Sequence, residues 1–140
     1  MKSRDAGETA WVLDPILEIP HVRAAVLLTR DGLVSGYTDA LTQATAERTA
    51  AIISTVHGAC RTAAAAFADH DDAEIRQIVI ESDHGYILVA PTSHGTCVAA
   101  YGGTEVRLDL LAHRVHSQVV RLGEKTMTAA PRAAEGGAPV

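Results

Sequence analysis

The sequence predicts an α+β fold, in which a five-stranded antiparallel sheet is flanked by helices in the order α-β-β-α-β-β-β-α. Three observations predict it. An Asp-Gly pair at 31–32 separates two apolar runs, a long helical apolar pattern fills the middle of the chain, and three short apolar runs follow with only a few turn residues between them. Such short connections require antiparallel neighbours, because a parallel crossover needs about a dozen residues or more.

The first elements are predicted as a helix over 8–19 and a hairpin. Apolar residues recur at helical spacing in Trp11, Val12, Ile16 and Ile19. Because proline is tolerated only in the first turn of a helix, Pro15 should make this helix very short or kink it. The runs 22–29 and 33–37 should be paired strands, since the Asp-Gly between them suits a turn that needs positive φ.

The longest element is predicted as a helix over 45–69, with Thr42 as its N-cap and Glu47 near the positive end of the helix dipole. One apolar stripe runs along it through Ala46, Ala50, Ile53, Val56, Cys60, Ala63 and Phe67. Ile52, Ala59 and Ala66 widen this stripe. A helix that is apolar over more than one face covers a sheet and also meets a second partner, which is a first indication of oligomerisation.

Three strands and a helix complete the prediction. The strands are expected over 74–82, 86–90 and 96–101, with turn residues between them. Thr104 should then cap a helix that ends near Gly123, with an apolar stripe of Leu108, Leu111, Val115, Val119 and Leu122.

Length and composition favour one small domain and exclude several functions. The chain has 140 residues, 47% of them apolar, and a net charge of −5. The acidic balance argues against nucleic acid as a partner, and no apolar run approaches the roughly 18 residues that span a bilayer. The polar start lacks the apolar core of a signal peptide, so we expect a cytoplasmic protein without membrane insertion, recruited to the membrane only through partners if at all.

The two ends differ in composition from the middle. We expect a flexible N-terminus over 1–7, one domain over 8–126 and a disordered tail over 127–140. From Thr128 the tail contains Pro, Gly and Ala but no large apolar group before the last residue, so burial cannot offset the entropy of ordering it.

Several stretches together resemble the roadblock/dynein light chain family. They are the short helix with Pro20, the Asp-Gly hairpin of 24–33, the run 76–81, the turn 83–86 and the small-residue strand around Cys97. The resemblance spans about 8–125 and is nearest to bacterial regulators encoded beside a sensor kinase-like protein and a small Ras-like GTPase. It implies a profilin-like roadblock fold. Pro15 departs from the family pattern, in which an acidic or neutral helix former is usual.

The resemblance also implies a function. The protein would be a non-enzymatic homodimeric adaptor that regulates a small Ras-like GTPase in bacterial signalling, with the sensor kinase-like protein as a further partner. Two copies would join edge strands into one sheet and pair their long helices. We expect Ile53, Val56, Ile75 and Ile78 in this interface. The width of the apolar stripe and the β-branched edge strand at 74–82 support dimerisation independently.

One basic line is the expected partner surface. Arg107, Arg114 and Arg121 are seven residues apart on the final helix. Most such lines are solvated helix faces and a minority bind an acidic partner. This line is the most concentrated positive charge in an otherwise acidic chain, so we expect it to contact the GTPase.

No residue set indicates catalysis, a cofactor or a metal. His57 with Cys60, and His113 with His116, have the three-residue spacing of helical metal ligands. Cys60 should instead be buried on its stripe, and the two histidines should flank the other stripe. Ser93, His94, Asp83 and His84 are explained as turn residues, and 123–126 departs from the phosphate-loop pattern and ends a helix.

The alternative function is a small-molecule sensor that binds a ligand between the sheet and the helices. Such sites place aromatic or polar groups in an apolar cavity. With 4% aromatic residues the chain offers few of them, which favours the adaptor.

Overall fold

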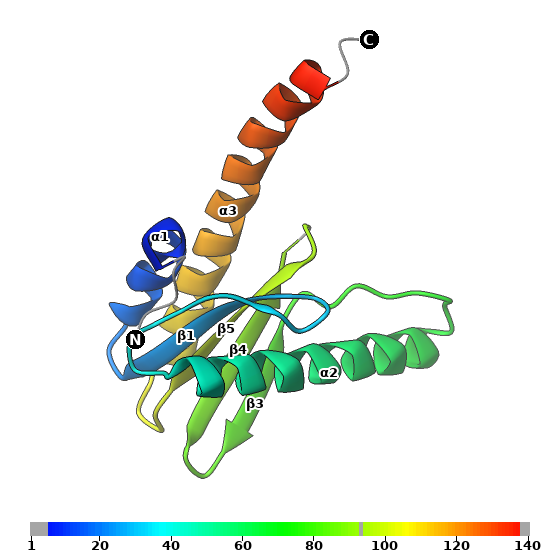
Figure 1. Ribbon diagram of the computed structural model, residues 1–140. Coiled ribbons are helices and arrows are strands. Elements are labelled where there is room, and N and C mark those ends of the chain that lie inside the picture. Colours follow the sequence, from blue (N-terminus) through cyan, green and yellow to red (C-terminus); the bar gives the residue numbers. More distant parts are fainter. Residues whose placement is uncertain (1–5, 93, 138–140) are drawn as a thin grey trace.

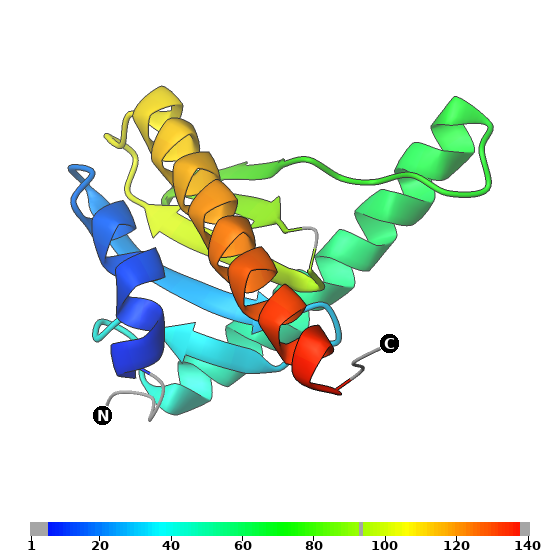
Figure 2. The same ribbon diagram turned by 90° about the horizontal axis from the view of Figure 1, so that it is seen from above.

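The predicted α-β-β-α-β-β-β-α order is confirmed. The computed structural model describes residues 6–92 and 94–137, and side chains from 9 to 125 except that of residue 93. The elements are α1 (Ala6–Leu17), β1 (Val22–Thr29), β2 (Val34–Tyr37), α2 (Gln43–Ala68), β3 (Ile78–Ser82), β4 (Gly85–Pro91), β5 (Thr96–Gly102) and α3 (Leu108–Gly137). The strands form one antiparallel sheet in the order β2-β1-β5-β4-β3. Helices α1 and α3 cover one face and α2 crosses the other (Figure 1, Figure 2).

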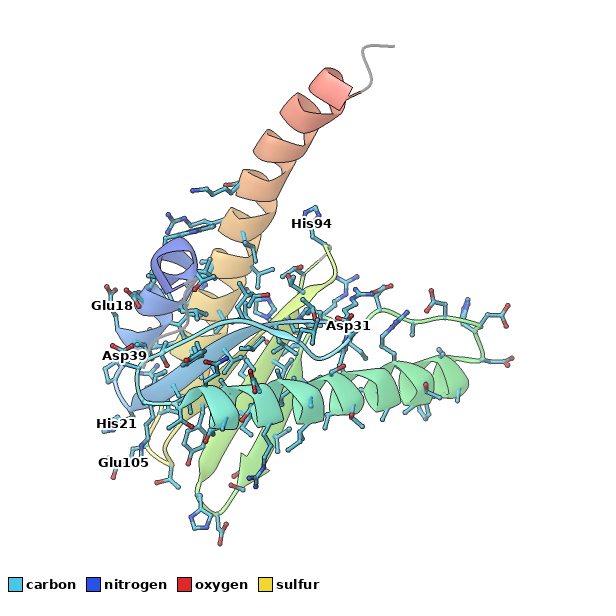
Figure 3. The ribbon with its side chains drawn as sticks, viewed as in Figure 1. Glu18, His21, Asp31, Asp39, His94 and Glu105 are labelled. Atoms are coloured by element: carbon cyan, nitrogen blue, oxygen red, sulfur yellow. The ribbon has the colours of Figure 1, made fainter. Side chains whose placement is uncertain are left out.

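The sheet separates two apolar cores. In β1, Ala25 and Leu27 pack with α1 and α3, whereas Val26 and Leu28 pack under α2. Alternate residues of a strand point to opposite faces, so a strand covered on both sides is apolar throughout. This explains the continuous apolar run of β1. At one end of the sandwich His21, in the α1–β1 connection, lies 3.7 Å from Glu105 beyond β5, and both are marked in Figure 3.

Helix α1 continues through Pro15 to Leu17, so of the two predicted outcomes, a very short helix or a kink at Pro15, the first is wrong. A proline here leaves the carbonyl of Trp11 without its usual N–H donor four residues later. The side chain of Gln118 on α3 supplies a donor, since its Nε2 lies 2.8 Å from the Trp11 oxygen and 3.1 Å from that of Val12. Gln118 is only 3% exposed. A tertiary contact therefore replaces the lost helical hydrogen bond.

Strand β3 begins at Ile78, four residues later than predicted. The pairing of Ile78 with Val89 would place Arg76 opposite Pro91. Thr92 donates its backbone N–H to Thr96 of β5, and backbone groups point alternately to either side of a strand. Pro91 therefore presents its backbone nitrogen to the β3 side, where it has no hydrogen to donate. The other strand ends differ from prediction by two residues or fewer.

Helix α2 has the predicted N-cap. The Thr42 side chain accepts a hydrogen bond from the Thr45 N–H at 3.1 Å, and the helix ends where Asp69 adopts a left-handed conformation. Its second half does not pack as predicted, because Ala63 is exposed and Phe67 is 95% exposed. A helix of 26 residues is about 39 Å long, whereas strands lie about 4.8 Å apart. The helix is longer than the sheet is wide and extends beyond it (Figure 2).

Helix α3 differs from prediction at both ends. Thr104 lies in a turn, and the helix begins at Leu108. It continues past Gly123 to Gly137, through most of the segment expected to be disordered. Leu111 and Val115 are buried as expected, and Leu108, Val119 and Leu122 pack partly against the same core. Residues 1–5 of the predicted flexible N-terminus, and 138–140, lie outside the described residues.

Candidate interaction surface

One side of α2 forms an uncovered apolar line, which we call the α2 flank. It consists of Thr49, Ile52, Val56, Cys60, Ala63 and Phe67. Ala46, Ala50, Ile53 and His57 are buried against the sheet and fix the orientation of the helix. The flank lies beside this buried line, with Ile52 54% exposed and Val56 half-buried. Large apolar groups arranged in a line on a surface favour contact with another protein.

The edge strand β3 lies at the side of the sheet beyond which the second half of α2 extends (Figure 2). Among the described residues no strand pairs with its outer edge. Ile78 and Ile80 are half-buried, and Val79, which points to the opposite face, is 40% exposed. An unpaired edge is a template for pairing with another chain.

An apolar groove lies between α2 and the sheet. Its volume is about 200 Å³. Leu41 and Thr49 border it from the α2 side, and Ala24, Ile87, Ala99 and Tyr101 from the sheet. All four sheet residues lie on the face that α2 crosses, at a place that the helix leaves open.

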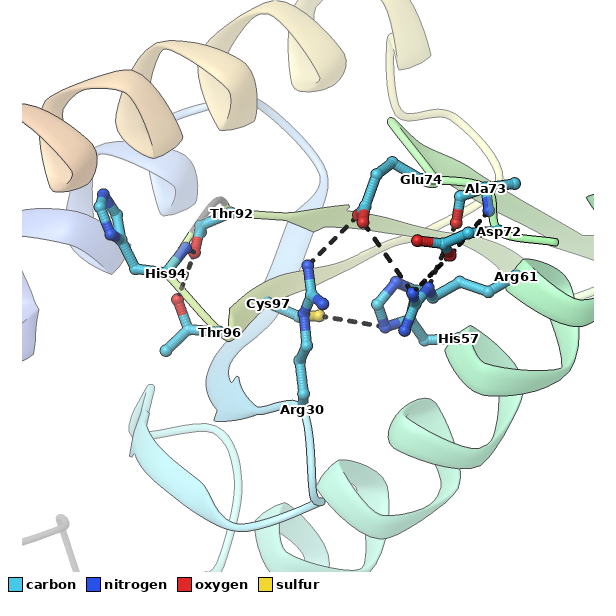
Figure 4. A network of polar contacts seen from close by, with 10 residues as sticks. All are labelled: Arg30, His57, Arg61, Asp72, Ala73, Glu74, Thr92, His94, Thr96 and Cys97. Atoms are coloured by element: carbon cyan, nitrogen blue, oxygen red, sulfur yellow. Dashed lines mark hydrogen bonds and ion pairs between the residues drawn. The ribbon is translucent and has the colours of Figure 1, made fainter. Parts of the chain in front are cut away.

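A polar network holds the segment that returns from α2 to β3 (Figure 4). Arg61 on α2 lies 3.0 Å from Asp72 and donates to the carbonyl oxygen of Ala73. Glu74 lies 3.4 Å from Arg30 and 3.9 Å from Arg61. These contacts join Arg61 of α2 to the segment before β3, and through Glu74 they reach Arg30 in the turn after β1.

His57 and Cys97 form a buried pair beneath this network. The His57 Nδ1 lies 3.9 Å from the Cys97 sulfur, and His57 is 3% exposed. Its Nε2 has no hydrogen-bond partner among the described residues. Burial, with the positive charges of Arg30 and Arg61, lowers the pKa of His57, and burial raises the pKa of the Cys97 thiol. Burial therefore favours the neutral form of each group.

The predicted interface residues are split between core and surface. Ile53 is buried in the core of its own chain, whereas Val56, Ile75 and Ile78 are half-buried. Ile75 lies in the segment before β3 rather than within the strand. Sequence periodicity did not single out the α2 flank or the groove, because the apolar stripe gave no sign of which part the sheet would cover.

The predicted basic line is engaged within the chain. Arg107 pairs with Asp109 at 2.7 Å, and Arg114 donates to the Pro15 oxygen at 2.5 Å and lies 3.3 Å from Glu18 at the end of α1 (Figure 3). The Arg121 guanidinium lies 5.6 Å from the centre of the Trp11 ring, which Lys125 also approaches. Arg114 and Arg121 thus help to fasten α1 to α3, a role that only the folded chain could show.

The remaining sequence candidates are dispersed. No group of three or more His, Cys, Asp and Glu that could hold a metal occurs in the described part of the chain. Cys60 is half-buried rather than buried, and His116 lies 2.8 Å from the Gln77 oxygen. Residues 123–126 lie within α3 and not between a strand and a helix start. Ser93 lies outside the described residues.

None of the described helices has both the length and the apolar character to cross a membrane.

The sheet carries one helix on one face and two on the other, and no described strand pairs with the outer edge of β3. Together with the exposed apolar flank of α2, this arrangement defines a small α+β interaction domain. The family model of the Roadblock/LC7 domain matches residues 9–101, and the chain belongs to this family.

Solved structures support the assignment. A Roadblock/LC7 domain from Streptomyces avermitilis is 30% identical, covers 84% of this chain and 96% of its own, and has a TM-score of 0.76. MglB from Myxococcus xanthus is 11% identical, with 86% and 96% covered and a TM-score of 0.74. Profilin II from Acanthamoeba castellanii is 13% identical, with 76% and 88% covered and a TM-score of 0.50. The last two show a shared fold. No curated protein is significantly similar in sequence.

Proposed function

We propose that the protein is a non-enzymatic homodimeric adaptor that regulates a small Ras-like GTPase in bacterial signalling. The observation that carries this proposal is the exposed apolar α2 flank together with the outer edge of β3, which no described strand pairs with, in a chain of the Roadblock/LC7 family. Two copies that join their β3 edges and pair their α2 helices would cover both features at once. The sensor kinase-like protein is a further proposed partner.

Two structural relatives bear on assembly and on the kind of process. One MglB structure has a tetrameric arrangement, and MglB of Thermus thermophilus is a gliding protein. These properties belong to those proteins, and we extend only the idea of a regulatory assembly to this chain. A GTPase-activating effect would come from ordering the residues of the GTPase itself, since Arg107, Arg114 and Arg121 all have partners within the chain.

The alternative, a small-molecule sensor, is favoured by one observation. An open cavity of about 690 Å³ lies between the α2–β3 connection, the β4–β5 turn and α3. Arg30, Arg76, Thr92 and His116 border it. A charged metabolite that raises the melting temperature of the purified protein would support this alternative; the adaptor requires none.

The experiment that tests the adaptor has two parts. Sedimentation of the purified protein at about 1 to 50 μM should show a dimer, whose fraction depends on concentration. Binding to the Ras-like GTPase encoded nearest to this gene should then be measured with GDP and with a GTP analogue. We expect binding that depends on the nucleotide; a monomer throughout, or no binding in either state, would contradict the proposal.

A further inference from the structure

The spacing of two residues on the α2 flank bears on how the α2 helices of two copies would pack. Thr49 and Phe67 are 18 residues apart, which is five full turns at 3.6 residues per turn. They therefore lie on the same line along the helix. Thr49 borders the apolar groove, whereas Phe67 is carried by the overhanging end of α2 and is 95% exposed.

The midpoint between these two residues along the helix axis is level with residue 58. A two-fold axis at this level, placed beside the α2 flank, would bring two α2 helices together in antiparallel orientation. In this register Phe67 lies opposite the partner's Thr49, next to the residues that border the groove.

The same register matches large side chains with small ones along the flank. Ile52 would lie opposite the partner's Ala64, and Val56 opposite the partner's Cys60. Large residues facing small ones interdigitate without voids or overlap. Each of these residues is half-buried or exposed in the single chain and thus available for contact.

We infer that Phe67 of each copy inserts into the apolar groove of the other, beside Leu41, Thr49, Ile87 and Tyr101, and is the anchor of the homodimer. The groove, at about 200 Å³, has room for one aromatic side chain. This inference rests on the proposed homodimer and specifies its register and its anchor. An aromatic group that fills a pocket at an interface commonly contributes most of the binding energy.

Substitution of Phe67 tests the anchor. Phe67→Ala should raise the dimer dissociation constant at least about tenfold, while Phe67→Leu, which keeps an apolar side chain, should raise it less. Because Phe67 is exposed in the single chain, neither change should lower the melting temperature of the dilute monomer. Val120→Ala on α3, at a 58% exposed apolar residue on the other face of the sheet, is the matched control and should leave the dissociation constant unchanged.

Cross-linking tests the register. In a Cys60→Ser background, chains carrying Thr49→Cys and chains carrying Phe67→Cys are mixed and treated with a short bismaleimide. At a protein concentration above the dissociation constant measured for Phe67→Ala, the mixture should give a covalent dimer. Either variant alone should not, because in this register identical residues of the two copies lie about 27 Å apart along the helix axis.

The outcomes separate the inference from the proposed function. A wild-type dimer that is unaffected by Phe67→Ala, or a mixture that does not cross-link, would overturn the anchor while leaving the homodimer in place. A monomeric wild type would overturn both.

Discussion

The buried side chain of Gln118 supplies a hydrogen bond that Pro15 cannot donate. Its Nε2 donates to the Trp11 and Val12 carbonyls, the first of which Pro15 leaves without a helical donor. Gln118→Leu should lower the free energy of unfolding by about 1–3 kcal/mol, the usual cost of a buried unsatisfied group. Pro15→Ala restores the backbone donor, so Gln118→Leu should cost less in that background. Urea unfolding of the four combinations measures the coupling; equal costs would show that Gln118 does not serve Pro15.

His57 makes stability depend on pH in a direction that its surroundings determine. Its pKa is lowered below 6.5 by burial and by Arg30 and Arg61. As the pH falls through 6.5, the unfolded chain takes up the proton before the folded chain does. Stability is therefore fully present above about pH 6.5 and decreases as the pH falls toward the lowered pKa.

Urea unfolding at pH 7.5, 6.5 and 5.5 checks this prediction. The loss of stability between the first and last pH should be smaller in His57→Gln than in the wild type. His84→Gln, at an exposed histidine in the β3–β4 turn, should keep the wild-type dependence. An unchanged pH dependence in His57→Gln would contradict the prediction.

At the scale of the element, the arginines of α3 could either bind a partner or contact other parts of the chain, and the sequence alone could not distinguish these two roles. The basic line was expected to be a docking surface, and Arg114 is instead bound to Pro15 of α1 and to Glu18 directly after it. Arg114→Glu would place two carboxylates together and loosen α1. Arg121 contacts the Trp11 ring of α1 as well, so Arg107, which pairs with the nearby Asp109, provides the better test of the predicted contact with the GTPase.

Reversal of the Arg107 charge should slow association. In Arg107→Glu, the association rate with the GTPase should fall at low salt and the difference from wild type should shrink as salt rises, because long-range charge attraction is screened. Stopped-flow measurements at two salt concentrations check this. Arg23→Glu, a reversal at an exposed residue of β1, is the control. Unchanged rates would exclude Arg107 from the interface and leave the surface of α2 as the candidate.

For the whole molecule, the segment after Thr128 should be dispensable for folding. Helix α3 continues to Gly137, and among its side chains that the structure describes, which end at Lys125, the buried ones such as Leu111, Val115 and Gln118 all precede Gly123. Removal of 128–140 should change the melting temperature by no more than about two degrees, which corresponds to less than about 1 kcal/mol. Circular dichroism of the truncated chain measures it, and a larger fall would show that the segment packs against the domain.

The sequence by itself determined the class of fold and the place of nearly every element. Alternation cannot identify a strand buried on both faces, but the apolar run 22–29 with the Asp-Gly turn after it was sufficient for β1. Thr42 marked the start of α2 because capping is a local interaction between a side chain and the next turn. The family was recognisable for the same reason, since turns and short strands are local patterns.

Tertiary structure decided which surfaces remain open. Whether Phe67 is buried depends on where the sheet ends beneath α2, and the length of a helix gives no information about the width of the sheet below it. The start of β3 depends on Pro91 in the neighbouring strand, and the continuation of α1 through Pro15 depends on Gln118, which is more than a hundred residues away. Local order follows from interactions within a few residues, whereas an interaction surface is what remains after distant segments have packed.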